Sequence, residues 1–185
     1  MRSAAILCVC AVASWVTPAV ALPASDQDIT VDVRKERSAF EITFEFTVPA
    51  SVEETWNVLA DYEHMAQIVS NIDSSRIVSR DGNRITVAQT SHGKVGPMQV
   101  SVDGVREIVL TPFKEIRSHL VKGDLKASDF TTNLHGEGAV TRVTGHGRLV
   151  AAAWVGWALS AETVAAQTRR QYQELRTEIL RRKAP

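Results

Sequence analysis

Cysteine is almost absent from this chain, and its two occurrences bear on processing rather than on chemistry. Cys8 and Cys10 lie within an N-terminal segment in which one arginine precedes an uncharged apolar run, Ala4 to Val16. The small residues that end at Ala21 form an A-x-A cleavage pattern, so residues 1–21 are predicted to be a secretory signal peptide. Cleavage after Ala21 would remove both cysteines. The mature protein would then have no disulfide, reactive thiol or thiolate metal ligand.

Long apolar runs are also missing after this segment. No later stretch reaches the roughly 20 apolar residues that a membrane-spanning helix requires. The alternative for the N-terminal segment is an uncleaved membrane anchor, but Pro18 and the small residues that follow it favour cleavage. An exported chain whose mature part lacks cysteine fits a periplasmic or secreted location.

An excess of charge of either sign is absent. The chain has 21 basic and 21 acidic residues, and loss of Arg2 with the signal leaves a net charge near −1. This balance gives no electrostatic footprint for nucleic acid, so no nucleic-acid partner is predicted. The five histidines form no cluster, and no metal site is predicted. Removing 21 of 185 residues leaves 164, enough for one domain with a sizeable core.

Signature motifs of common enzymes are missing as well. The chain contains no G-x-S-x-G elbow, H-E-x-x-H helix, P-loop or G-x-G-x-x-G fingerprint. Asp61, Glu63 and His64 are close in sequence and could do acid–base work, but capping of a helical joint is the simpler interpretation. No catalytic residue and no cofactor is therefore predicted, and the sequence leaves the oligomeric state open.

What the chain does contain is the period-two pattern of antiparallel strands. Between Phe40 and Val48, aromatic and aliphatic residues alternate with acids and threonines, which predicts a strand with one buried face. Residues 22–37 are expected to be a flexible leader, with a strand over 29–33 as the alternative. After Ile72, turn signals such as Asp81-Gly82-Asn83 divide the chain into about six further strands, with a bulge expected at Gly104. Their short connections predict a meander.

Helical patterns flank these strands. Ser51 and Glu54 form a capping box before a short helix, and a second short helical piece follows. From Ser160, a plausible N-cap, to Arg182, an apolar stripe at helical spacing predicts a long amphipathic helix. The predicted fold class is α+β: a curved antiparallel sheet of about six to seven strands wrapped around the C-terminal helix, with two short helices after the first strand.

The segment from Val48 to Met65 resembles a known pattern. Val-Pro-Ala-Ser-Val-Glu-Glu-Thr-Trp-Asn-Val-Leu-Ala-Asp-Tyr-Glu-His-Met is similar to the opening of the START-like (SRPBCC) helix-grip superfamily, in its polyketide-cyclase and coenzyme-Q-binding branch. The element order covers nearly all of residues 38–183, which we expect to form one ligand-binding domain. Many relatives carry a tryptophan where this chain has Asn133-Leu134. The resemblance implies a hydrophobic ligand, such as a lipid, quinone or polyketide, between sheet and helix.

The residues expected to line that cavity are mostly apolar, as small-molecule sites prefer, although each could equally be an ordinary core residue. They are Phe40, Ile42, Phe44, Met65, Met98, Phe130, Leu134, Trp154, Trp157, Val164, Thr168, Tyr172 and Leu175.

The uncharged run from Leu149 to Leu159 is too short to span a bilayer. One hypothesis makes it an apolar gate whose two tryptophans contact a membrane surface transiently, and the alternative is a buried linker. Strand parity after Gly104 is not determined by the sequence, so His119, His146, Arg106, Arg142 and Arg148 could face either the cavity or solvent.

Three functions remain open. The first is a non-enzymatic binder or carrier of a hydrophobic small molecule. The second is a cyclase- or dehydratase-type enzyme that acts on a polyketide-like substrate in the same cavity. The third is a module that docks a protein partner in the periplasm.

Overall fold

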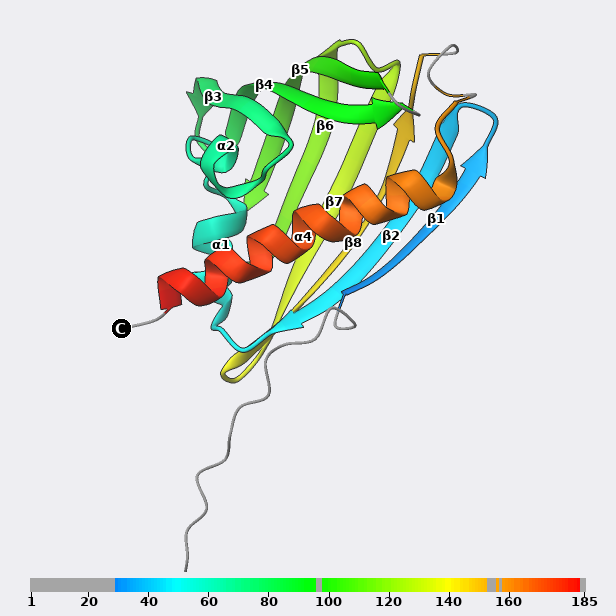
Figure 1. The fold of residues 1–185 in the computed structure, drawn as a ribbon. Coiled ribbons are helices and arrows are strands. Elements are labelled where there is room, and N and C mark those ends of the chain that lie inside the picture. The colour runs from blue at the N-terminus through cyan, green and yellow to red at the C-terminus, as the bar shows by residue number, and fades with distance from the viewer. Residues whose placement is uncertain (1–28, 96–97, 153–155, 157, 184–185) are drawn as a thin grey trace, which may run out of the picture.

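The strands of this protein form a single antiparallel sheet (Figure 1). The computed structural model describes residues 29–95, 98–152, 156 and 158–183. Trp154, Trp157 and the predicted signal peptide lie outside the described residues. Eight strands are described, namely β1 (Ile29–Glu36), β2 (Ala39–Val48), β3 (Ile72–Asp81), β4 (Arg84–Val95), β5 (Met98–Thr111), β6 (Glu115–Gly123), β7 (Ala127–Glu137) and β8 (Val140–Val150).

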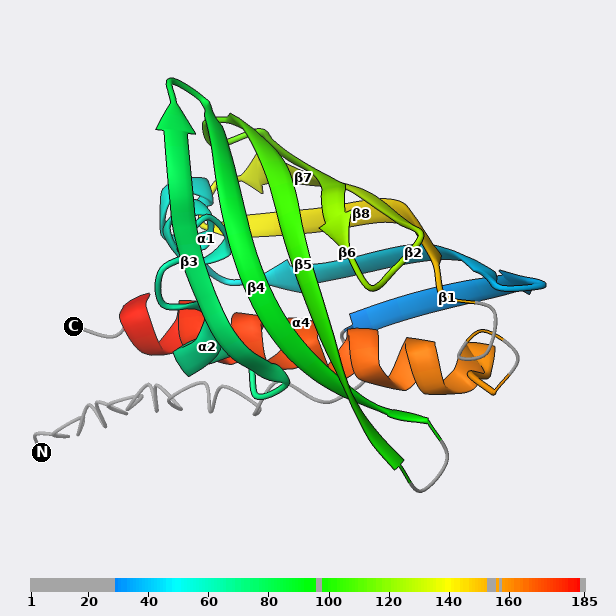
Figure 2. The same cartoon turned by 90° about the horizontal axis from the view of Figure 1, so that it is seen from above.

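The sheet is built from a meander and a hairpin, and their pairing determines the strand order. Strands β3 to β8 form the predicted meander, and the β1–β2 hairpin joins it by pairing β2 with β8, which gives the order β1-β2-β8-β7-β6-β5-β4-β3. The turn at Asp81-Gly82-Asn83 connects β3 to β4 as predicted, and Gly82 has a φ of 54°, in the left-handed region that glycine adopts readily. The sheet is strongly twisted, so its two ends face different directions (Figure 2).

The strand count is higher than predicted because residues 29–36 are not a leader. They pair with β2 from Ile29 opposite Phe46 to Glu36 opposite Ala39, so they belong to the sheet. Polar and charged residues occupy the outward positions of this edge strand, a common property of sheet edges that weakened the strand pattern in the sequence.

The helices lie where the sequence places them. Helix α1 (Val52–Leu59) begins with the predicted capping box, in which Ser51 Oγ accepts from Glu54 N at 3.2 Å. Helix α2 is Met65–Ile68, and α4 is Ala161–Lys183. Ser160 Oγ accepts from Thr163 N at 3.1 Å, which confirms the predicted N-cap of α4. Helix α4 crosses the concave side of the sheet and packs against β1, β2 and α1 (Figure 1).

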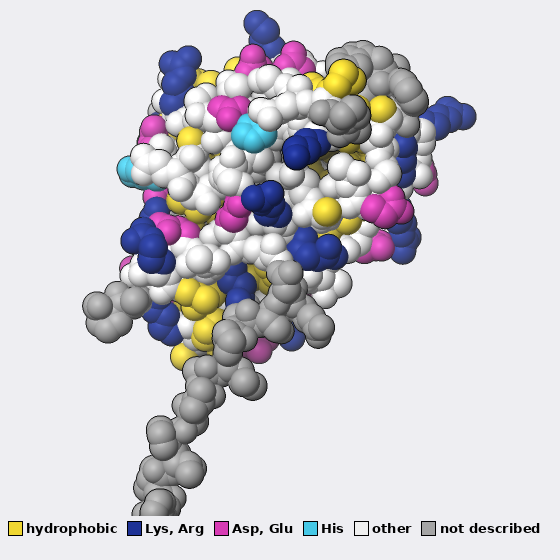
Figure 3. Space-filling model, viewed as in Figure 1, with side chains coloured by type: hydrophobic (Ala, Val, Ile, Leu, Met, Phe, Trp, Pro, Cys, Tyr) yellow, Lys and Arg dark blue, Asp and Glu magenta, His cyan; other side chains and the backbone are white. Residues whose placement is uncertain are grey.

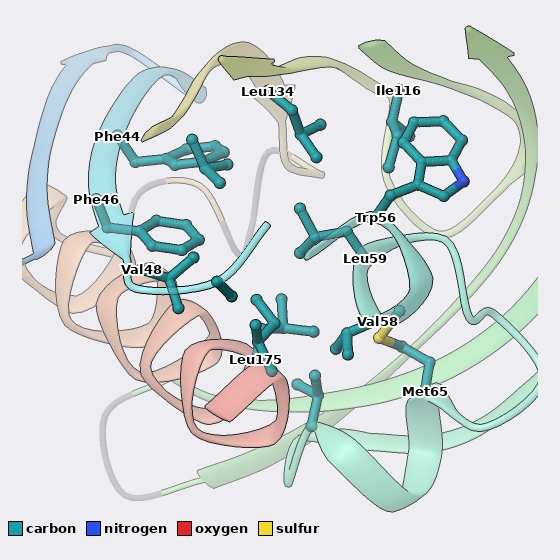
Figure 4. Close-up of a cluster of buried hydrophobic side chains, with 14 of the residues drawn as sticks. Phe44, Phe46, Val48, Trp56, Val58, Leu59, Met65, Ile116, Leu134 and Leu175 are labelled. Atoms are coloured by element: carbon teal, nitrogen blue, oxygen red, sulfur yellow. The ribbon is translucent and has the colours of Figure 1, made fainter. Parts of the chain in front are cut away.

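Two separate hydrophobic clusters form the core between the sheet and α4. The main cluster gathers around α1, α2 and the C-terminal half of α4, where Leu175 and Ile179 are buried (Figure 4). The second cluster is smaller and consists of buried Phe40, Ile42 and Ala151, with Val164 of α4 among its partly buried neighbours. The long amphipathic helix therefore contacts a different cluster near each of its ends.

Candidate functional site: a polar strip between the two hydrophobic clusters

The pairing of the strands determines which side chains face α4. Ile42 pairs with Gly147, Gly147 with Phe130, Phe130 with Ser118, and Ser118 with Ile108. Because directly opposed residues in a sheet point to the same face, this row lies on the inner face together with buried Ile42 and Ile108. The same reasoning places Arg106, Ser128 and Thr132 on the inner face.

Four of these inward residues are polar and lie between the two clusters. Ser118 separates Ile108 of the main cluster from Phe130 at the edge of the second. We call Arg106, Ser118, Ser128 and Thr132 the polar strip. Ser128 is buried, whereas the other three are only half-buried although they point toward the interior. These three residues therefore keep some contact with solvent although they belong to inward rows of the sheet.

The guanidinium of Arg106 is the one charged group of the polar strip. Its Nη1 donates to Ser128 Oγ at 2.9 Å, and Ser128 is 1% exposed. Burial lowers the pKa of Arg106, because removal from water disfavours the charged form. No carboxylate in the described part of the chain forms an ion pair with it. The sequence left the orientation of this arginine open, and the structure turns it inward.

Two tyrosines lie near the polar strip. The ring of Tyr172, from α4, stacks on Phe44 with ring centroids 3.8 Å apart, and its side chain is hydrogen-bonded to that of Thr132. Tyr62 comes from the joint between α1 and α2. Burial raises the pKa of both tyrosines, and the charge of Arg106 opposes this shift in Tyr62 to a smaller extent. Both phenols therefore stay protonated at neutral pH and can donate hydrogen bonds.

Further polar contacts hold the Tyr62 segment against the sheet. Ser75 Oγ of β3 donates to the carbonyl oxygen of Tyr62 at 2.6 Å, and Gln89 Nε2 of β4 donates to Ser75 Oγ at 3.1 Å. Tyr62 belongs to the Asp61-Tyr62 pair of the segment that resembles the family pattern. These contacts hold the pair against the sheet, where the Tyr62 side chain packs against the main cluster.

The remaining residues whose orientation the sequence did not determine face solvent. His119, Arg142, His146 and Arg148 are exposed and belong to outward rows of the sheet. His119 Nδ1 lies 2.5 Å from an oxygen of Asp129.

These outward rows border a shallow, open hollow of about 390 Å³ on the side of the sheet opposite α4, and Ile42, Ser118, Phe130 and Gly147 of the inner row also contribute to its lining. Ion pairs such as Arg148–Glu41, at 3.0 Å, occupy its walls. Its charges therefore already have partners within the protein.

Most of the residues predicted to line a cavity face the interior, but they do so in different places. Phe40, Ile42, Phe130 and Val164 belong to or pack against the second cluster, and Phe44, Met65, Leu134, Tyr172 and Leu175 belong to or pack against the main one. Figure 4 shows Met65 beside Val58 at the α1–α2 end of the core. Thr168 lies on α4 one turn from Val164, whose carbonyl accepts its hydroxyl at 2.8 Å.

Met98 is a correction to the predicted lining. It is 58% exposed at the start of β5, and its partner across the hairpin is Val95. Pairing between β5 and β6 begins only at Gly104, so residues 98–103 extend beyond β6. The expected bulge is displaced in the same region: Gly104 pairs regularly with Gln89, and the register shift lies between Val105 and Arg106.

The polar strip itself was missed by the sequence reasoning. Its members come from three strands and have no common spacing, so only the register brings them together. The one available signal was an arginine within a strongly apolar strand segment, Val105 to Leu110. Among the described residues, no helix is long and apolar enough to cross a membrane, and no group of three or more His, Cys, Asp or Glu residues could hold a metal ion.

Comparison with known proteins agrees with this architecture. Residues 48–131 match the family described as polyketide cyclase / dehydrase and lipid transport. No curated protein sequence matches the chain at a significant level.

Three solved structures illustrate the similarity. A STAR-related lipid transfer protein from Xanthomonas axonopodis is 16% identical, with a TM-score of 0.67 over 86% of this chain and 98% of that chain. The Zhui aromatase/cyclase from Streptomyces sp. R1128 is 16% identical, with a TM-score of 0.66 over 79% and 96%. Human STARD10 is 14% identical, with a TM-score of 0.67 over 87% and 73%. At these identities the similarity establishes the fold, and it confirms the START-like resemblance.

Proposed function

Because residues 48–131 match the polyketide cyclase / dehydrase and lipid transport family and the domain has the START-like fold, we propose that the protein binds a hydrophobic small molecule between its sheet and α4. The observation that carries this proposal is the polar strip, whose half-buried residues point inward and separate two apolar clusters. An apolar ligand there would leave water at about 25 cal/mol per Å² of buried surface.

The titratable groups near the polar strip favour binding over catalysis. Tyr62 and Tyr172 have raised pKa values and so are poor bases at neutral pH. The described inward positions of β2 and β4–β8 include no Asp, Glu or His. General acid–base catalysis at neutral pH relies on such groups. A cyclase-type enzyme is the second candidate, since Tyr62, Arg106 and Tyr172 could orient an oxygen-rich substrate.

Export of the protein is part of the proposal. It is supported by the charged, apolar and A-x-A segments of residues 1–21, and the expected mature N-terminus is Leu22. N-terminal sequencing of the protein from its native host tests it. A chain that still begins at residue 1 would contradict cleavage.

The Trp154 and Trp157 gate also remains a proposal, supported by the uncharged run around the two tryptophans. Liposome co-sedimentation of the Trp154→Ala/Trp157→Ala variant should show weaker partitioning than the wild type. Equal partitioning would end the gate hypothesis.

The binding proposal is tested by filling the space at the polar strip. Ser118 faces inward from β6 at half-burial, and its neighbour His119 faces solvent. Native mass spectrometry of the protein from its own host should find a co-purified apolar molecule, and Ser118→Phe should abolish its retention. His119→Phe adds the same ring on the outer face and should retain the ligand. Equal retention in both variants, with both folded, would refute a site at the polar strip.

A further inference from the structure

Ion pairing separates Arg106 from the other arginines of β4 to β8. Arg117, Arg142 and Arg148 face outward, and each lies within 4 Å of a glutamate oxygen, at 2.8, 3.8 and 3.0 Å. On the α4 face of the molecule, basic and acidic side chains are similarly interspersed (Figure 3). Arg106 is the inward arginine of β4 to β8, and within the described chain no carboxylate is its ion-pair partner.

An inward guanidinium without an ion-paired carboxylate is costly unless another group compensates its loss of water. An arginine stays protonated in proteins and offers five N–H donors in a planar fork. For Arg106 the described hydrogen-bond acceptor is one neutral oxygen, Ser128 Oγ. Burial of a charge normally requires a paired anion, and its loss of water is not offset by one hydroxyl. The remaining donors are therefore available to an anion from outside the chain.

The surroundings of Arg106 define the shape and charge of that anion. The polar groups in closest contact with Arg106 are neutral: the hydroxyl of Ser128 and the phenol of Tyr62, which is close enough for Arg106 to affect its ionisation. The nearest carboxylate that acts on Arg106, that of Asp129, belongs to an outward row of the sheet, pairs with His119 and forms no ion pair with the guanidinium. The charge to be matched is therefore a single one. Apolar residues lie on both sides of the polar strip, with Val87 opposite Arg106 in the main cluster and Phe130 in the second. A ligand that satisfies both features has one negative head and an apolar body.

We propose that the ligand is an amphiphile with a carboxylate head, which Arg106 binds through its guanidinium fork while Ser128 holds the arginine in place. This inference rests on the proposed binding function and specifies its ligand class. The planar fork of arginine matches a carboxylate in a bidentate manner, which lysine cannot do.

The test compares two probes that differ only in their head. Isothermal titration calorimetry at pH 7.5 measures decanoate and decanol binding to the wild type, Arg106→Gln, Arg106→Lys and Arg117→Gln. The wild type should bind decanoate at least about tenfold more tightly than decanol. Arg106→Gln should weaken decanoate binding by roughly 10- to 100-fold, the range for a hydrogen bond to a charged group, and leave decanol unchanged. Arg106→Lys should be intermediate, and Arg117→Gln should behave like the wild type.

The outcomes separate this inference from the function on which it rests. Equal affinity of the wild type for both probes, or unchanged decanoate binding in Arg106→Gln, would overturn the carboxylate anchor and leave the binding function intact. Failure of both probes to bind would count against the binding function itself. Tight binding of short-chain phosphatidylglycerol but not of decanoate would show that the oxyanion is a phosphodiester, and would overturn the assignment to a carboxylate.

A measurement on the wild type alone covers the case in which Arg106→Gln does not fold. Carbon-13 NMR of carboxyl-labelled decanoate follows the ionisation of the bound head as the pH is lowered. Pairing with Arg106 should keep the pKa of the bound carboxyl below that of free decanoate. A pKa that is unchanged or raised would contradict the pairing.

Discussion

A methyl group added at Gly145 should destabilise the protein, because it would collide with the ring of Phe44, which packs between the sheet and α4. Gly145 lies on the inner face of β8 opposite Phe44. A Cβ at this position would lie 2.1 Å from Phe44 Cζ and 2.2 Å from Cε1. The Phe44 ring is buried and stacked on Tyr172, with centroids 3.8 Å apart, so it has little room to move aside.

The size of the effect follows from this geometry. Carbon atoms in van der Waals contact stand about 3.5 to 4.0 Å apart, so the ring would have to move by roughly 1.5 Å. Overpacking of this kind costs about 1–3 kcal/mol, and the confined position of Phe44 places Gly145→Ala near the upper end, about 3 kcal/mol. For a domain of this size the corresponding fall in Tm is roughly 6–12 °C.

Urea unfolding followed by circular dichroism measures this loss. Gly93→Ala is the matched control, because a Cβ there would meet nothing within 4 Å, and its stability should stay within about 0.5 kcal/mol of the wild type. The double variant Phe44→Leu/Gly145→Ala should lose less than the sum of the single changes. If Gly145→Ala unfolds at the same urea concentration as Gly93→Ala, the close packing of Phe44 against β8 and α4 is refuted.

Two further predictions concern the ends of helices. Arg181 and Arg182 hold the pKa of Glu178 at about 2, below its ordinary 4.5, so the stability from these pairs is present above pH 4.5 and is lost as the pH falls toward 2. Chemical unfolding of Glu178→Gln across this window should show a flatter pH dependence than the wild type, and parallel curves would contradict the assignment. Ser51→Ala removes the capping box of α1, in which Ser51 N also donates to Glu54 Oε2 at 2.7 Å. It should cost about 1 kcal/mol in urea unfolding, whereas an unchanged midpoint would show that the cap is dispensable.

The sequence predicts the elements that carry strong local signals. The alternation between Phe40 and Val48 identifies β2, and Ser51 with Glu54 identifies the start of α1. The apolar stripe after Ser160 identifies α4 and its buried face, which includes Leu175 and Ile179. In each case one element contains the whole pattern, so periodicity and capping chemistry are enough.

Features that depend on register could not be predicted in the same way. Whether Arg106 faces the interior depends on its pairing with Val87 in β4, because the register shift beside it skips Val121 of β6 and leaves the alternation of β5 unbroken. Met98 shows the converse, because its strand continues past the end of β6 and exposes it. Long-range pairing decides both positions, and no local pattern in the sequence reports it.

The most direct test of the central claim asks on which face of the sheet an apolar ligand lies. A doxyl-labelled fatty acid broadens the methyl resonances near its spin label in the NMR spectrum. If the ligand lies between the sheet and α4, the methyl groups of Leu149 and Val164 should broaden, while those of Val109, which lines the outer hollow, should stay sharp. Broadening of Val109 with sharp Leu149 and Val164 signals would place the ligand on the outer face and contradict the account.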